Sequence, residues 1–354
     1  MADTHDSITH LLENGVRERV FPGAVWAIGD ADTVLDNGAC GTTAPDQAAM
    51  CPDTVFDVAS LTKILAVWAV IGTLWHDQQL PLDDPLATFW PEAAGYPLGH
   101  VTARQLLTHT AGVPLRANLR ALYGTDPQAI REGVLREGLH RPPGEAVEYT
   151  DRAALILGFL AEHLAAAPLD QLAAERIWHP LAMTGTRFGP LPAQDRPRCA
   201  PTEFDPDSGV HLQGIAHDYS ARLLGGVCGI AGVFSVLHDL AILLRHLLPP
   251  GPDPGRVGFG PAWVAESLRI HTGDLTPARG ILWHPAPGTS THDDVHVHYG
   301  FTGTAMWLSP KQNRWAVLLT NKLYFSRDRN PLMAIRNAFC TLVFGCPGEG
   351  TVEP

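Results

Sequence analysis

Lysine is almost missing from this sequence. Lys and Arg together number 25 of the 354 residues, yet only Lys63, Lys311 and Lys322 are lysines. The formal net charge is −12, and no run of basic residues offers the cluster of cations that neutralises nucleic-acid phosphates. We therefore expect no nucleic-acid partner, and any chemistry that needs a deprotonated amine has few candidates.

Zinc-binding and membrane signals are also missing. The six cysteines lack C-x-x-C spacing, so we expect small buried thiols rather than zinc ligands. The N-terminus has no basic start followed by an apolar core. The most apolar segment, residues 64–74, is shorter than the roughly 20 residues that span a bilayer. The sequence therefore predicts a cytoplasmic protein without a membrane partner.

The chain does have the composition and length of an enzyme with an enclosed cleft, at 45% hydrophobic and 18% charged residues. Residues 23–28 and 33–35 and several segments after Gly280 read as strands, whereas the middle of the chain reads as helices and loops. This order predicts an α/β (α+β) fold. An antiparallel sheet from residues 1–81 and 265–354 is flanked by helices, and residues 82–264 form an inserted helical lobe.

Ser60 and Lys63 form an S-x-x-K motif at the start of an apolar helical segment. Residues three apart are neighbours on a helix, so the two side chains can meet. A serine hydroxyl becomes a nucleophile when a base removes its proton, and an arginine cannot serve as that base. Nine serines and three lysines would produce this spacing by chance about 0.08 times, so the match favours a catalytic pair.

The motif is part of a wider resemblance to the serine β-lactamase and penicillin-binding-protein superfamily. The chain is closest in pattern to class C β-lactamases, D-Ala-D-Ala carboxypeptidases and β-lactamase-like carboxylesterases or transesterases. The matching segments are TVFDVASLTK, QLLTHTAGVP, RPPGEAVEYTD, GGVCGIAGVFS, HYGFTGT and LLTNK. They extend from about Phe21 to Phe339 and imply a β-lactamase/transpeptidase-like fold.

By this resemblance, Tyr149 stands at the tyrosine of the family's Y-x-N motif and shuttles a proton between Ser60 and the leaving group. Asp151 replaces the usual asparagine. We expect its carboxylate to pair with Lys63 and favour the charged amine, which moves the role of base toward Tyr149. His109, in QLLTHTAG, is implied to be a structural residue of a turn that ends a helix.

The third family motif, K-T-G or H-T-G, reads His298-Tyr299-Gly300 here. The resemblance implies that His298 supplies a donor or partial positive charge, and that Gly300 allows a close backbone approach to substrate. It also implies an oxyanion hole formed by the N–H groups of Phe301 and Ser60. Tyr299 replaces a threonine that helps the family bind substrate carboxylates, which disfavours an antibiotic or cell-wall substrate.

An alternating row of His292, Asp294, His296 and His298 could share one strand face and hold a metal. The family position assigns His298 to the cleft, so we expect no metal, and no cofactor is implied. The row is better explained by polar residues near a strand edge.

The predicted function is that of a serine hydrolase or transacylase that forms an acyl-enzyme at Ser60. Its partner would be a small-molecule ester or amide, with an amine or alcohol as a further acceptor. A β-lactamase or D-amino-acid peptidase is the alternative, and a non-catalytic scaffold of the same fold is the other. The sequence carries no indication of the oligomeric state.

Overall fold

The computed structural model describes residues 2–115, 118–248, 257–289 and 294–345. Its main element is a six-stranded antiparallel sheet in the order β2-β1-β11-β10-β9-β8, so both ends of the chain contribute strands. The strands are β1 (Gly23–Gly29), β2 (Val34–Gly41), β8 (His284–Pro285), β9 (His296–Tyr299), β10 (Ala305–Ser309) and β11 (Arg314–Thr320). The predicted antiparallel sheet is confirmed.

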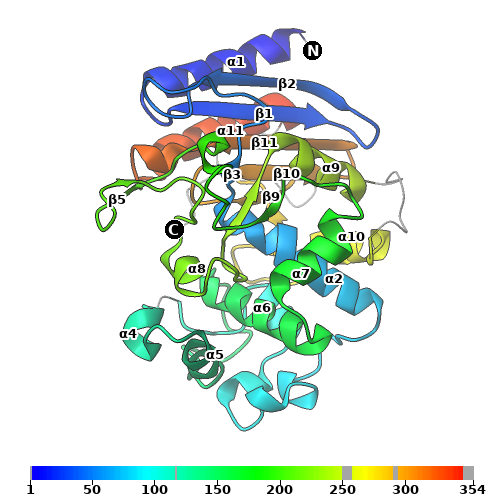
Figure 1. Cartoon of the computed structure of the whole chain (residues 1–354). Helices are drawn as coiled ribbons and strands as arrows, with labels where there is room; N and C mark the ends of the chain where they lie inside the picture. Colours follow the sequence, from blue (N-terminus) through cyan, green and yellow to red (C-terminus); the bar gives the residue numbers. More distant parts are fainter. Residues whose placement is uncertain (1, 116–117, 249–256, 290–293, 346–354) are drawn as a thin grey trace.

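Helices cover both faces of this sheet (Figure 1). On one face, α1 (Ala2–Arg17) and α11 (Asn330–Phe344) lie against each other and bury an apolar cluster that includes Trp26 and Trp307. On the other face, α9 (Leu237–Leu247) contacts β11 and β1. Because both faces are covered, β1 and β11 read as nearly continuous apolar runs and are buried along almost their whole length.

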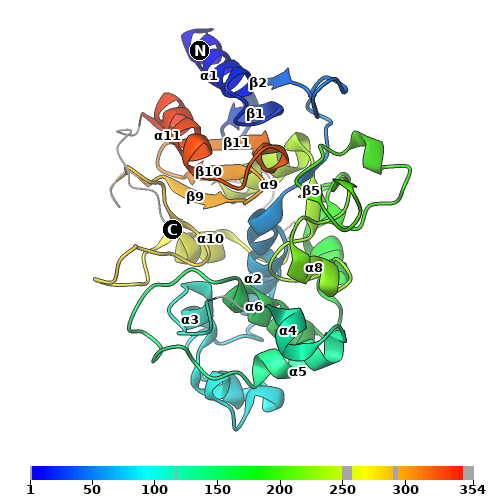
Figure 2. The same ribbon diagram turned by 90° about the vertical axis from the view of Figure 1, so that its left-hand side faces the viewer.

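Helices and loops form the rest of the molecule, on the side of α9 away from α1 (Figure 2). The helices here are α2 (Ala69–His76), α3 (Ala103–Leu107), α4 (Leu119–Tyr123), α5 (Pro127–Leu135), α6 (Asp151–Ala165), α7 (Leu169–Ala173), α8 (Tyr219–Leu223) and α10 (Pro261–Leu268). Short strands form two small sheets: β3 (Phe56–Asp57), β7 (Val233–Ser235) and β4 (Arg187–Phe188) in one, and β5 (Phe204–Asp205) and β6 (Val210–His211) in the other.

The helical segment after Ser60 passes through the centre of the molecule. It begins as a 3₁₀ turn (Ala59–Leu61), continues as a π-helical stretch (Lys63–Trp68) and ends as α2. By length and composition Ala59–His76 could cross a membrane, but 83% of it is buried inside the protein. A helix that is apolar all round and packed on every side is a core helix, as the sequence predicts.

Some contacts cross the predicted boundary between the two lobes. Helix α9 falls in the range 82–264 but covers the main sheet. Strand β7 falls in the same range and pairs with β3, which lies in the range 1–81. The two-lobe division stays a prediction, with one lobe formed by residues 1–81 and 265–354 and the other by residues 82–264.

Five of the six cysteines lie in the described part of the chain and are free thiols. Cys199, Cys228 and Cys340 are buried, as expected for small apolar side chains. Cys51 is exposed and Cys40 half-buried, so the expectation of buried thiols is wrong for Cys51. Cys346 lies outside the described residues.

Candidate active site

Ser60 lies in a tight turn between β3 and the core helix. Ala59 has a φ of +51°, in the left-handed region that costs a residue with a side chain energy. The Ala59 N–H donates to Asp57 Oδ1 at 2.9 Å, and the Val58 N–H donates to the Val233 carbonyl at 3.1 Å. These bonds hold the strained turn that presents the Ser60 hydroxyl at the pocket wall.

Lys63 is fully buried, and its ammonium group contacts Ser60 directly. Its Nζ lies 2.9 Å from Ser60 Oγ, 2.8 Å from Asp151 Oδ1 and 2.9 Å from the Ile230 carbonyl oxygen. Burial by itself would lower the pKa of Lys63, but Asp151 and Tyr149 together raise it above its usual value. The pairing of Lys63 with Asp151 expected from the sequence is present, and it keeps the amine charged.

Tyr149 and Asp151 are placed by the N-terminus of α6. Thr150 is the N-cap, because its hydroxyl oxygen accepts the Arg152 N–H at 3.1 Å and its hydroxyl donates to the Pro114 carbonyl at 2.8 Å. Asp151 is the first residue of the helix, and Tyr149 immediately precedes the cap. The cap therefore fixes the directions of both side chains relative to Lys63.

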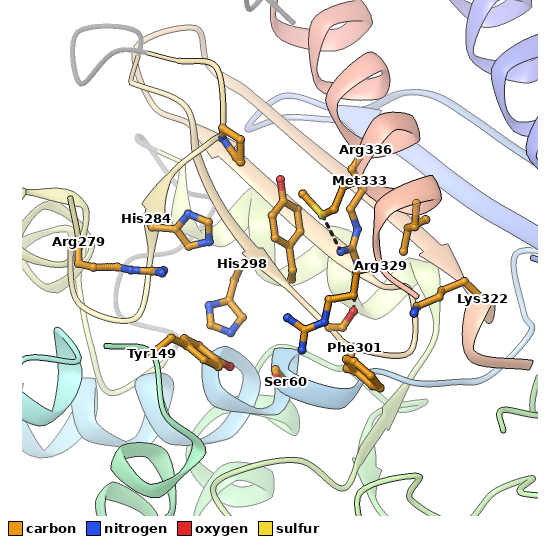
Figure 3. A pocket seen from close by; sticks show the side chains of 14 residues that line it. Ser60, Tyr149, Arg279, His284, His298, Phe301, Lys322, Arg329, Met333 and Arg336 are labelled. Atoms are coloured by element: carbon orange, nitrogen blue, oxygen red, sulfur yellow. Dashed lines mark hydrogen bonds between the residues drawn. The ribbon is translucent and has the colours of Figure 1, made fainter. Parts of the chain in front are cut away.

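The Tyr149 ring lies between buried groups and the pocket. Its side chain is 40% exposed, its centroid lies 4.6 Å from that of His109, and Lys63 Nζ lies 5.5 Å from it. Figure 3 shows its hydroxyl directed toward Ser60. His109 follows α3 with a φ of +58° and is buried, so it packs behind the phenol.

His298 lies in the cleft beside Ser60 (Figure 3). Burial and the charge of Lys63 lower its pKa to about 3, against a smaller opposing effect of the Leu282 carbonyl. Its Nδ1 lies 2.7 Å from the Leu282 carbonyl oxygen, which can only accept, so the proton resides on Nδ1. The low pKa favours a neutral ring that donates through Nδ1, and the role of His298 as a donor or partial positive charge in the cleft stays a prediction.

Gly300 lies in close contact with other residues of the protein. A Cβ at this position would lie 2.0 Å from Thr304 Oγ1, 2.5 Å from the Val58 carbonyl oxygen and 3.4 Å from Ala59 Cβ. The glycine thus lets the end of β9 lie against the Ser60 turn. Gly300 also lines the pocket, and its close approach to substrate stays a prediction.

The two predicted oxyanion-hole donors are the main-chain N–H groups of Ser60 and Phe301. Over the described residues, neither N–H forms a main-chain hydrogen bond outside the helices and strands. Phe301 lines the same pocket as Ser60. The arrangement fits two main-chain donors directed at one oxyanion, but these roles stay predictions.

The pocket over Ser60 is open to solvent, and the space of about 850 Å³ that it covers includes part of the bulk solvent. Its cationic residues are Arg279, Lys322, Arg329 and Arg336, and among the described residues no Asp or Glu lines it. Figure 3 shows Arg279 toward one end and Lys322 toward the other. The pocket is therefore positive in a chain whose net charge is −12.

Two of these cations, Lys322 and Arg336, are buried. Burial lowers the pKa of Lys322 to about 8 and that of Arg336 to about 10, and the charge of Arg336 adds to the effect on Lys322. Arg336 donates to the carbonyls of Gly300 and Thr304 at 2.9 and 2.7 Å. Its guanidinium carbon also lies 4.4 Å from the centroid of the Tyr299 ring.

The members of the His292, Asp294, His296 and His298 row, considered above for a metal, do not share one set of partners. His292 lies outside the described residues, His296 Nε2 contacts Asp294 Oδ1 at 3.3 Å, and His298 bonds to Leu282. Over residues 2–115, 118–248, 257–289 and 294–345, no three His, Cys, Asp or Glu side chains gather in a way that could hold a metal ion.

The structure brings Ser60, Tyr149 and the 298–301 segment together at one pocket, with Lys63 in contact with Ser60, and their catalytic roles stay predictions. Sequence reasoning missed the cations of the pocket and the buried Asp57–His217 pair beneath the Ser60 turn. The high share of Arg among the basic residues was one signal that could have pointed to the cations of the pocket. No local pattern connects Asp57 with a histidine 160 positions later.

Comparison with known proteins agrees with this arrangement. The Beta-lactamase family model matches residues 8–338. An Escherichia coli K12 protein with the provisional name D-alanyl-D-alanine carboxypeptidase is 30% identical over 306 residues, which cover 76% of this chain and 69% of that protein.

Solved structures show the same fold. A class C β-lactamase from Rhodobacter sphaeroides superposes with a TM-score of 0.74 at 18% identity, covering 95% of this chain and 99% of that chain. EstCE1, described as a hydrolase with promiscuous acyltransferase activity, gives a TM-score of 0.73 at 20% identity, covering 95% and 98%. The family model covers most of the sequence and the fold agrees with it, so this chain belongs to the beta-lactamase family.

Proposed function

We propose that this protein is a serine hydrolase or transacylase that acts on an ester or amide of a small molecule through an acyl-enzyme at Ser60. The observation that carries the proposal is the 2.9 Å contact between Lys63 Nζ and Ser60 Oγ beside an open pocket. A nucleophile in contact with its activating group is the usual sign of covalent catalysis. The structural neighbour EstCE1, a hydrolase with promiscuous acyltransferase activity, adds support for both hydrolysis and acyl transfer.

The proposed proton route follows from the charge of Lys63. A lysine that is already protonated cannot accept the Ser60 proton, so in the proposed route Tyr149 acts as a phenolate beside the Lys63 ammonium and takes the proton as Ser60 Oγ attacks the carbonyl carbon. Tyr149 then gives the proton to the leaving alcohol or amine as the bond to the carbonyl breaks. Water, or an alcohol or amine acceptor, repeats the attack on the acyl-enzyme and releases Ser60.

The positive pocket suggests that the acyl donor carries an anionic group. In the part of the chain that the structure describes, four cationic residues and no carboxylate line the pocket, and such a lining favours ligands of negative charge. This observation also supports the second candidate, a D-amino-acid peptidase or β-lactamase, whose substrates carry a carboxylate. The name of the Escherichia coli relative points the same way, whereas Tyr299 in place of the family threonine points to the first candidate.

A three-substrate assay separates these candidates. The protein is incubated with 4-nitrophenyl butyrate, with nitrocefin and with a D-Ala-D-Ala peptide, and mass added at Ser60 by a fluorophosphonate is measured. Turnover of the ester alone supports the esterase-like function, and turnover of nitrocefin or the peptide supports the second candidate. Absence of labelling on the folded wild-type protein would leave the non-catalytic scaffold.

Two variants control this assay. Ser60→Ala removes the nucleophile, so both labelling and turnover should disappear while the melting temperature stays near that of the wild type. Lys63→Ala should lose acylation as well, because the charge beside Ser60 and Tyr149 is gone. An active Lys63→Ala enzyme would contradict the proposed role of this lysine.

A further inference from the structure

A buried carboxylate lies directly beneath the Ser60 turn, outside the groups described as reacting. The side chain of Asp57 is 1% exposed, and it comes three residues before Ser60 at the end of β3. Its Oδ1 accepts the Ala59 N–H at 2.9 Å, so the carboxylate bonds to the residue that precedes the nucleophile. A hydrogen bond to a charged acceptor is among the stronger kinds in proteins.

The other oxygen of this carboxylate is held by His217. Asp57 Oδ2 accepts the His217 main-chain N–H at 2.8 Å and its Nδ1–H at 3.0 Å. Burial would lower the pKa of His217, but the Asp57 carboxylate, with smaller contributions from Asp218 and Glu203, raises it above its usual value. Each member of the pair therefore compensates the buried charge of the other.

The Asp57–His217 pair also contacts the segment that carries Phe301, the second predicted oxyanion donor. The His217 ring is stacked on the Phe301 ring, with centroids 5.8 Å apart and planes 22° apart. The Thr302 hydroxyl donates to the Asp57 carbonyl at 2.7 Å, and the Thr304 hydroxyl donates to the Val58 carbonyl at 3.0 Å. These contacts connect the 301–304 turn to the two residues that precede Ala59.

We propose that Asp57 is a positioning residue which, with His217 and Thr302, holds the Ser60 and Phe301 N–H groups at the separation that an oxyanion needs. Ser60 and Phe301 come from segments about 240 residues apart, and a preorganised pair of donors requires that they be held together. Asp57 bonds to both segments, through its carboxylate to the Ser60 turn and through its carbonyl to Thr302. The inference rests on the proposed acyl transfer at Ser60.

The test compares ester turnover with the binding of methylboronic acid, which forms a tetrahedral adduct with an active-site serine and so reports on the oxyanion hole. In Asp57→Asn, we expect kcat and the boronate affinity to fall together by about tenfold or more, because loss of one donor costs on the order of 10²- to 10³-fold. The KM for 4-nitrophenyl butyrate should change by less than about threefold, because ground-state contacts are left in place.

Substitutions at His217 and Thr302 test the contacts separately. His217→Phe keeps a ring against Phe301 and the main-chain N–H bond to Asp57 but loses the side-chain donor, so it should show a loss in the same direction as Asp57→Asn. His217→Asn retains a side-chain N–H donor and should recover most of the lost rate. Thr302→Val is close in shape to the wild type and removes only the hydroxyl. It should therefore give a smaller loss of kcat and of boronate affinity. If Asp57→Asn does not fold, Thr302→Val provides the test of the inference.

Asp239→Asn is the matched control. Asp239 is also a buried carboxylate that accepts a main-chain N–H, from Gly185 at 2.8 Å, and a hydroxyl, from Thr186 at 2.7 Å, but it lies in α9. Equal losses of kcat in Asp57→Asn and Asp239→Asn would show a general effect of destabilisation and overturn the inference. So would an Asp57→Asn enzyme with unchanged kcat and boronate affinity. A folded wild-type protein without turnover or labelling would instead remove the proposed function itself.

Discussion

At the scale of single residues, the charge of Lys63 determines which group can act as the base. The amine is buried, and burial alone would make it a neutral base at moderate pH. The contact with Asp151 Oδ1 at 2.8 Å reverses this effect and raises the pKa of Lys63. An aspartate at the position of the family's asparagine therefore favours the charged form of Lys63.

Asp151→Asn tests this coupling. Without the carboxylate, burial becomes the main influence on Lys63, so its pKa should fall and the amine should lose its proton at a lower pH. Since the charged lysine supports Tyr149 in the proposed route, the alkaline limb of kcat/KM should move to lower pH by at least about one unit. The measurement is a pH–rate profile between pH 5 and 10, and an unchanged alkaline limb would show that the two residues are not coupled.

At the scale of elements, the site depends on how closely the end of β9 lies against the Ser60 turn. Gly300 permits this contact, and Arg336 from α11 stabilises the same segment through the Gly300 and Thr304 carbonyls. The strand, the turn and the C-terminal helix are therefore joined at one point beside the nucleophile. A change of one methyl group there should affect all three.

Gly300→Ala tests whether the end of β9 must lie this close to the Ser60 turn. Its Cβ would lie within 2.5 Å of the Val58 carbonyl oxygen, so β9 and the Ser60 turn must separate. We expect a loss of about 1–3 kcal/mol in the free energy of unfolding and a large loss of kcat, because overpacking shifts backbone. Gly138→Ala is the control, since a Cβ there meets nothing within 4 Å, and it should leave activity unchanged. Equal behaviour of the two variants in urea unfolding would contradict the argument.

At the scale of the whole molecule, buried neutral histidines make the fold sensitive to acid. Burial lowers the pKa of His109 and His284 well below the usual value, and it lowers that of His298 to about 3. In the unfolded chain a histidine takes up a proton near pH 6.5, whereas these folded side chains do not. Their contribution to stability is therefore full above that pH and decreases as the pH falls below it.

His298→Asn isolates one of these contributions. An asparagine keeps a side-chain N–H for the Leu282 carbonyl but has no titrating group. Between pH 7.5 and pH 5, the loss in the free energy of unfolding should be smaller in the variant by about 2 kcal/mol, which is the linkage for 1.5 pH units below the unfolded pKa. Urea unfolding at the two pH values gives the comparison, and equal losses in both proteins would show that His298 titrates normally.

Local relationships were predictable from the sequence. Ser60 and Lys63 meet because three positions on a helical segment bring side chains together, and the apolar residues after Lys63 already indicated a buried helix. The strands at both ends of the chain were recognisable by their apolar, β-branched content, and their order along the chain indicated a sheet made from both termini. The main features of the fold and the nucleophile are thus properties of short segments.

The sequence by itself determined that a serine and a lysine would be neighbours at the start of a buried helix, because that contact needs only helical geometry. The tertiary structure decided which of the surrounding groups carry charge. Asp151 reaches Lys63 across 88 positions, His217 reaches Asp57 across 160, and His298 is neutral because of the groups folded around it. Protonation depends on burial and on partners in space, and distance along the chain indicates neither.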